Sequence, residues 1–224
     1  MARYPAGHKG ETRTRILAAS EALMKDRGIE AASVDAVMRG AGLTVGGFYA
    51  HFASKEELAG ETLLYGLEQS FERMIGALEG RSGREWVRAM IRLYLAQADD
   101  EALEHACPLT LLLADVARAD DERKRRFAAT TRAMLDRVVR HFPGRPGLSP
   151  REAALATYSA LVGAVGLART TPSRSARHAI MHACETMLVS WLDLDAHEAI
   201  ASPAPRKARG VRVNPRRSRS RRAH

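Results

Sequence analysis

Apolar side chains recur at helical spacing along most of this chain, and no segment has the pattern of a credible strand. Gly28 is placed where a glycine commonly ends a helix. Ser33 precedes a second helix as its cap, and Ser54 and Glu57 form a capping box ahead of a fourth. The first 80 residues therefore predict four helices, at about Glu11 to Arg27, Ser33 to Ala41, Val45 to His51 and Ser54 to Leu78.

The chain from residue 80 to about residue 195 predicts five more helices. Ser82 begins a second capping-box pattern, S-x-x-E, and Pro108 fits the first position of the next helix. Phe127 to Phe142 carry a further apolar stripe. The last two helices follow Ser149 and Pro172, and Ser149 is itself followed by a proline that suits a helix start. An all-α fold of about nine helices is therefore predicted.

Residues 33–58 contain a short apolar-periodic helix, then Gly42, then a second short helix. This order is typical of a helix-turn-helix, which places its second helix in the major groove of DNA. Phe48 and Phe52 are spaced to face a core. The outer side of the same helix would carry Thr44, Tyr49 and His51.

On this segment the chain resembles the TetR family of bacterial transcriptional repressors. The residues that carry the resemblance are Thr44, Gly47, Phe48, Tyr49, His51, Phe52, Lys55, Glu57 and Leu58. The resemblance is strong over about residues 10 to 60 and rests on helical layout alone beyond them. It implies a three-helix head that binds operator DNA, and a helical body that binds a small-molecule inducer and forms a homodimer.

Several side chains of the head are suited to contacts with double-stranded DNA. Thr44 caps the recognition helix, whose N–H groups would then face a phosphate. Tyr49 and His51 suit phosphate contacts, and Lys55 adds a positive charge beside them. Val45 can touch a thymine methyl group. The candidate DNA contacts are Ser33, Arg39, Thr44, Val45, Gly46, Gly47, Tyr49, His51 and Lys55.

Gly46 and Gly47 are unexpected inside a short helix, where each costs about 1 kcal/mol relative to alanine. Close approach of the backbone to DNA would explain them, and so would close approach to the preceding helix. Ser33 is first a helix cap and only second a phosphate contact. The whole segment could also be a surface hairpin with a glycine-rich elbow. The alternative function is therefore a helical interaction or adaptor protein that does not read DNA.

The last two helices are the predicted dimer interface. The first is rich in alanine and glycine, which lets another helix approach closely, and the second supplies larger apolar side chains. Two such helices from each subunit would form a four-helix bundle. Packing of the same helices within one subunit is the alternative. The candidate interface residues are Ala156, Ala160, Gly163, Ile180, Met187, Leu188 and Trp191.

Aromatic and apolar residues of the body are the candidates for a ligand site, although ordinary core packing would also explain them. They are Trp86, Met90, Tyr94, Cys107, Leu111, Met134 and Tyr158. The sequence contains no G-x-S-x-G, H-E-x-x-H or P-loop motif and no cluster of metal ligands. We therefore expect no catalytic residue, no metal site and no cofactor, and a protein that is not an enzyme.

Cys107 precedes a proline that fits the first turn of a helix, so we expect this thiol at a helix N-cap. Such a position lowers the pKa of a thiol, and His105 could add to the effect. The resulting hypothesis is a thiolate that senses oxidants or electrophiles. The alternative is that Cys107 is a small apolar core residue, as Cys184 is expected to be.

The net charge of +9 belongs to the C-terminal segment. Nine basic residues follow Glu198, and the remaining 26 basic residues equal the 26 acidic ones. Residues 196–224 have almost no apolar mass, which predicts a disordered basic tail. That tail is either a solvated extension or a source of nonspecific attraction to DNA.

Three segments of the chain are predicted to differ in role. Residues 1–60 would be the DNA-binding domain, residues 61–195 the ligand-binding and dimerisation domain, and residues 196–224 the tail. The two cysteines and the absence of a long apolar stretch or a signal-like start predict a cytoplasmic protein without a membrane partner. The function expected is a ligand-responsive repressor released from a palindromic operator by an inducer of unknown identity.

Overall fold

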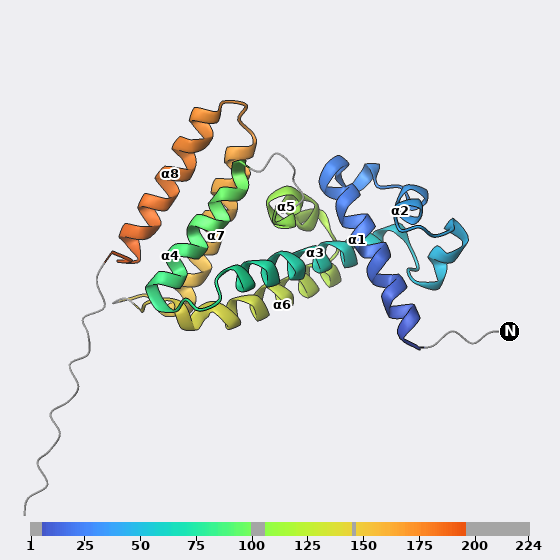
Figure 1. Ribbon diagram of the computed structural model, residues 1–224, viewed down its shortest axis with the longest axis horizontal. Helices are drawn as coiled ribbons and strands as arrows, with labels where there is room; N and C mark the ends of the chain where they lie inside the picture. The colour runs from blue at the N-terminus through green and yellow to red at the C-terminus, as the bar shows by residue number, and fades with distance from the viewer. Residues whose placement is uncertain (1–5, 100–105, 145–146, 196–224) are drawn as a thin grey trace, which may run out of the picture.

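The computed structural model describes residues 6–99, 106–144 and 147–195, and this part of the chain is helical (Figure 1). It contains no β-strand, and none of its helices is both long and apolar enough to cross a bilayer. The α-helices are α1 (Ala6–Ala31), α2 (Val34–Gly40), α3 (Lys55–Ala77), α4 (Gly83–Ala96), α5 (Pro108–Arg118), α6 (Asp121–Val138), α7 (Pro150–Arg169) and α8 (Arg174–Trp191). The 3₁₀ helices are η1 (Val45–Ala50), η2 (Gln97–Asp99) and η3 (Val139–His141).

The all-α prediction is confirmed: within the described residues the eight α-helices and the recognition helix η1 make nine, and η2 and η3 add one short turn each. The first helix begins at Ala6, earlier than expected, because residues 6–10 carry no apolar stripe to reveal it. Gly28 has φ 80° and ψ 168°, so the regular helix breaks at the glycine that was expected to end it.

Two separate hydrophobic cores divide the molecule. The smaller core lies in the head, residues 6–58, and consists of Ile16, Leu17, Met24, Ala32, Val37, Met38, Ala41, Phe48, Phe52 and Leu58. The larger core lies in the body, where α4, α7 and α8 pack beside one another and α6 runs along α3 (Figure 1). The expected boundary between residues 60 and 61 falls inside α3, which is continuous from the head into the body. The division into two domains is consistent with the two cores but stays a prediction.

The helix caps agree with the sequence in most places. Ser149 and Glu152 form the full capping box of α7, in which each side chain accepts from the other residue's backbone N–H. Ser54 caps α3, but the Glu57 carboxylate accepts from the N–H of Ala53 at 2.7 Å, one residue before the cap. The capping box expected at Ser82 is wrong, because the Ser82 side chain makes no capping hydrogen bond.

Candidate nucleic-acid interface and ligand cavity

The recognition element η1 is held on the head by two aromatic side chains. Phe48 and Phe52 are each 1% exposed, and their rings stack with centroids 5.8 Å apart. The guanidinium of Arg13 in α1 lies over the Phe52 ring, 4.2 Å from its centroid. Gly46 and Gly47 favour the α-helix weakly, and the tighter 3₁₀ form suits so short a piece. The backbone of η1 is therefore fixed from below by the head core.

The opposite side of η1 is open to solvent. Tyr49 is 76% exposed and Val45 is 42% exposed, and Thr44 and Gly46 are exposed beside them. Thr44 occupies the N-cap of η1, yet its side chain makes no capping hydrogen bond. Four of the candidate DNA contacts thus lie together on one outer surface.

Helix α2 contributes two further candidates, both exposed. The Ser33 hydroxyl accepts from the N–H of Ala36 at 3.2 Å, so it caps α2 as expected. Arg39 forms an ion pair with Asp35 at 2.6 Å on the outside of the same helix. An exposed pair of this kind contributes little to stability, so a phosphate can compete for the guanidinium at small cost.

The remaining candidates, Gly47, His51 and Lys55, are half-buried. Partial burial lowers the pKa of His51, and the nearby positive charges of Lys9 and Arg13 lower it further. Its imidazole is therefore mainly neutral at pH 7 and can donate a hydrogen bond to an anion without carrying a full charge. The backbone carbonyl of His51 accepts a hydrogen bond from Arg13.

The two glycines of η1 differ in their surroundings. A Cβ on Gly47 would lie 3.7 Å from Cε of Met38, an ordinary packing distance. A Cβ on Gly46 would meet no heavy atom within 4 Å. Neither glycine is therefore required by a close approach of the preceding helix. In contrast, Gly42 has φ +66°, so the turn before η1 does require glycine.

A cavity of about 680 Å³, counted with its open mouth, lies in the body between α3, α4, α6 and α7. Six of the seven residues expected from the sequence line it: Trp86, Met90, Tyr94, Cys107, Met134 and Tyr158. The other lining residues are Leu67, Ser70, Phe71, Met74, Gln97, Thr131, Leu135, Val138, Phe142 and Ala154. Leu111 is not among them, because α5 turns Leu109 and Leu112 into the core instead.

The contribution of α3 to the cavity was missed, although the sequence carries a signal for it. Leu67, Phe71 and Met74 follow at helical spacing of four and three residues, so they share one face of α3. That any of these residues binds a ligand stays a prediction.

Cys107 is the N-cap of α5, with Pro108 in its first turn, as expected. Its backbone N–H donates to Oε1 of Gln97 at 2.8 Å. The expected low thiol pKa is wrong: burial raises the pKa of Cys107 and outweighs the hydrogen bonds and the charge of Lys25 that lower it. Burial raises the pKa of Cys184 as well. His105 lies outside the described residues.

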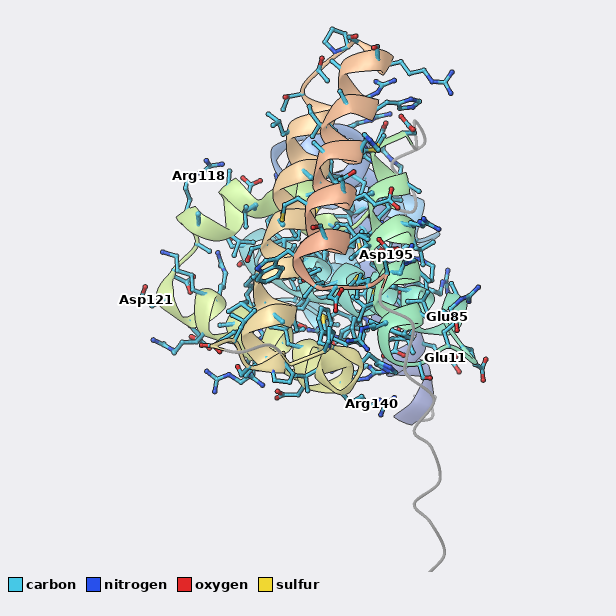
Figure 2. The ribbon with its side chains drawn as sticks, turned by 90° about the vertical axis from the view of Figure 1, so that its left-hand side faces the viewer. Glu11, Glu85, Arg118, Asp121, Arg140 and Asp195 are labelled. Carbon is cyan, nitrogen blue, oxygen red and sulfur yellow. The ribbon has the colours of Figure 1, made fainter. Side chains whose placement is uncertain are left out.

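The predicted dimer residues lie on α7 and α8, which run side by side nearest the viewer in Figure 2. Met187 is 49% exposed, Ala156 and Gly163 are exposed, and Ala160, Ile180 and Trp191 are half-buried. The prediction that Leu188 lies in the dimer interface is wrong. Its side chain is 1% exposed within the subunit and faces the body core, so it cannot lie on the outer surface. The outer surface instead includes Leu155 and Leu167, which are 50% and 58% exposed.

The head and the cavity meet at one buried junction. A Cβ on Gly66 of α3 would lie 2.7 Å from Oε1 of Glu21 in α1 and 2.8 Å from Cγ of Pro108 in α5. Glu21 also forms an ion pair with Lys25 at 2.7 Å, and both side chains are largely buried. Because Pro108 follows Cys107, a residue of the cavity wall, the start of α5 touches both the cavity and the head.

Helix α2, the turn at Gly42 and the exposed η1 have the arrangement of a helix-turn-helix. Residues 16–62 match the family model described as bacterial regulatory proteins, tetR family. The head therefore matches the TetR family model, and the resemblance found in the sequence is confirmed. This family consists of regulatory DNA-binding proteins rather than enzymes.

One curated relative is the HTH-type transcriptional repressor KstR2 of Mycobacterium tuberculosis strain H37Rv. It is 32% identical to this chain over 114 residues, which are 50% of this chain and 54% of that protein. The match thus spans about half the length of the relative and includes the body only in part.

Solved structures extend the likeness in fold to nearly the whole described chain. A TetR transcriptional regulator from Chloroflexus aurantiacus J-10-FL has a TM-score of 0.64 at 24% identity, with 84% of this chain and 96% of that chain covered. The reduced form of NemR from E. coli has a TM-score of 0.65 at 20% identity, with 80% and 96% covered. The body therefore has the fold of TetR-type regulators as well as the head.

Proposed function

We propose that this protein is a ligand-responsive, DNA-binding transcriptional regulator, in which a homodimer represses from a palindromic operator until a small molecule enters the body. The observation that carries the proposal is the outer side of η1. Tyr49 and Val45 are exposed there on a backbone that Phe48 and Phe52 hold firmly. Large exposed side chains on an element whose inner side is held by the head core are better suited to a partner than to the protein's own core.

In this proposal, the residues of the head divide by the part of DNA that they contact. Val45 reads a thymine methyl group, whereas Thr44, Tyr49, His51 and Lys55 contact phosphates. The exposed guanidinium of Arg39 and the Ser33 cap flank this surface on α2. Gly46 allows the backbone of η1 to approach the groove.

The dimer would form through the outer surface of α7 and α8. Leu155, Leu167 and Met187 are exposed in one subunit, and leaving such large apolar side chains in water is unfavourable. A two-fold axis through this surface places two heads on two half-sites of a palindrome.

Induction would act through the start of α5. A ligand in the cavity pushes on Cys107, and Pro108 transmits that shift to Glu21 of the head because both crowd Gly66. The body thereby changes the spacing or orientation of the heads and weakens operator binding.

The proposal is tested by mobility shift with DNA from upstream of the gene and with random DNA of equal length, at several salt concentrations. Selective binding to a palindrome is expected. Lys55→Ala should weaken both DNAs about equally and reduce the salt slope by about 1. The matched control is Lys124→Ala, an exposed lysine of α6 outside the head. Binding that depends neither on the DNA sequence nor on the salt concentration would instead favour the adaptor alternative.

A further inference from the structure

The cavity wall offers hydrogen-bonding groups but no charge among the described residues that form it. Its polar members are Ser70, Tyr94, Gln97, Cys107, Thr131 and Tyr158, and all are uncharged side chains. The remaining lining residues are aliphatic, aromatic or methionine side chains. An ion in this cavity would therefore lose its hydration without gaining a charged partner from these residues.

The charged or titratable side chains next to the wall are engaged with other partners. The guanidinium of Arg137 lies over the Phe71 ring and pairs with Glu72, and His141 stacks on Trp86 with its pKa lowered by burial. Lys25, whose charge acts on the Cys107 thiol, forms an ion pair with Glu21 at 2.7 Å. Arg169 donates a hydrogen bond to the backbone carbonyl of Gln97. Recruiting Lys25 or Arg169 to an anionic ligand would break an existing contact that is buried or partly buried, which is costly.

Two buried hydroxyl groups of the wall have no strong hydrogen-bond partner in the part of the chain that the structure describes. The Tyr94 hydroxyl, on a residue that is 5% exposed, and Oγ1 of Thr131 have no oxygen or nitrogen partner among the described residues. The nearby thiol of Cys107 is only a weak partner for Tyr94. Burial, with smaller effects of Cys107 and Tyr158, raises the pKa of Tyr94, so its hydroxyl remains a neutral donor.

A buried hydroxyl without a partner is uncommon in proteins and implies that something else satisfies it. We infer that the cavity binds an uncharged, mainly apolar molecule carrying a hydroxyl or carbonyl oxygen, which hydrogen-bonds to Tyr94 and Thr131. This inference rests on the proposed function, because it names the chemical class of the inducer. Aromatic and methionine side chains, such as Phe71 and Met90, would cover the apolar part of that molecule.

The test uses two probe pairs that differ in charge at similar shape: 2-naphthol with 2-naphthoate, and 1-decanol with decanoate. The protein is the full chain with Trp191→Phe, which leaves Trp86 of the cavity wall as the one remaining tryptophan of the sequence. Binding is read by quenching of Trp86 fluorescence, and correct folding by thermal unfolding. Tyr94→Phe and Thr131→Val remove the two hydroxyls, and Tyr65→Phe, outside the cavity wall, is the control.

At least one neutral probe should bind tenfold or more tightly than its carboxylate partner, since an unpaired buried charge costs more than about 1.4 kcal/mol, the equivalent of a tenfold change. Tyr94→Phe or Thr131→Val should weaken that probe about fivefold, and Tyr65→Phe should not. Equal or tighter binding of a carboxylate, or no binding of either neutral probe, overturns the inference. An unchanged affinity in both hydroxyl variants overturns the anchoring by Tyr94 and Thr131.

Operator binding is measured in parallel on the wild-type protein without any probe, because Trp191 is itself a candidate dimer residue. A protein that binds its operator but prefers the carboxylates refutes the ligand class and leaves the proposed function standing. A protein that binds no operator refutes the proposed function, whatever the probes do.

Discussion

Gly46 lies on the outer side of η1 with open space where its side chain would be. No contact within the described residues requires a glycine there, yet glycine is a poor helix former. The cost is explained if the space is occupied by DNA in the complex. The case is weaker at Gly47, because a side chain there would contact Met38 of the head as well as any bound DNA.

Gly46→Leu should therefore abolish operator binding. The melting temperature should stay the same or rise, because the free energy of unfolding should increase by up to about 1 kcal/mol. Mobility shift and calorimetry measure the two effects. Gly76→Leu is the matched control, because Gly76 of α3 is also exposed, with nothing within 4 Å of its Cβ position, and lies far along the chain from the head. If Gly46→Leu unfolds the head, the glycine serves the fold instead of DNA approach.

Cys107 shows how burial can reverse an expectation drawn from local sequence. A helix N-terminus favours the thiolate, but removal from water disfavours any charge and is the larger effect here. Since the pKa of Cys107 is raised, its thiolate fraction at pH 7 is smaller than that of a free cysteine.

Iodoacetamide should therefore alkylate Cys107 in the folded protein more slowly than it alkylates the same thiol after unfolding, and the rate should increase only at alkaline pH. Mass spectrometry separates this site from Cys184. Operator release by a small quinone should be the same in wild type and in Cys107→Ser. Loss of that release in Cys107→Ser would restore the electrophile-sensor hypothesis.

At the level of helices, α3 is the element that joins the two cores. Its first turns pack on α1, where the buried hydroxyl of Thr62 donates to Ser20 at 2.9 Å, and its later turns line the cavity. Gly66 lies between these two parts and leaves room for Glu21 and Pro108. The head and body are thus linked through tightly packed side chains rather than through a flexible hinge.

Gly66→Ala should push Glu21 and Pro108 apart and cost about 1 to 3 kcal/mol of stability, as overpacking of a buried site does. It should also weaken operator binding in the absence of any ligand. Chemical denaturation and mobility shift measure both. Gly76→Ala on the same helix has open space and should stabilise slightly. Wild-type operator affinity in Gly66→Ala would argue against coupling through this junction.

At the level of the whole molecule, the exposed apolar side chains of α7 and α8 are a feature that packing within one subunit does not explain. Leu155, Leu167 and Met187 are each about half exposed. Helices that pack closely across a two-fold axis need small residues between such side chains, and Gly163 supplies one.

The protein should therefore sediment as a dimer, and Gly163→Asp together with Leu167→Asp should convert it to a monomer and weaken binding to the palindrome. Analytical ultracentrifugation gives the oligomeric state. Leu113→Asp, at a leucine of α5 that is 50% exposed, is the control and should leave the dimer intact. A dimer that survives the double substitution places the interface elsewhere.

Helical periodicity and caps were enough to predict the elements, because burial of one face repeats every three to four residues and depends on neighbours in sequence. The head was predictable for a similar reason: Phe48, Phe52 and the glycines lie within a few residues of one another. Six of the seven expected cavity residues also lie in the cavity wall, since large apolar side chains on adjoining helices have few other places to pack.

Only the tertiary structure decided the features that depend on which helices meet. It placed α3 in the cavity wall, turned Leu188 inward and Leu111 away from the cavity, and buried Cys107 deeply enough to raise its pKa. It also brought Glu21 and Pro108, from two other helices, close to Gly66 of α3. The sequence by itself determines which face of each helix is apolar. Contacts between residues far apart in the chain determine which helix packs on that face, and therefore the dielectric environment of the side chains buried there.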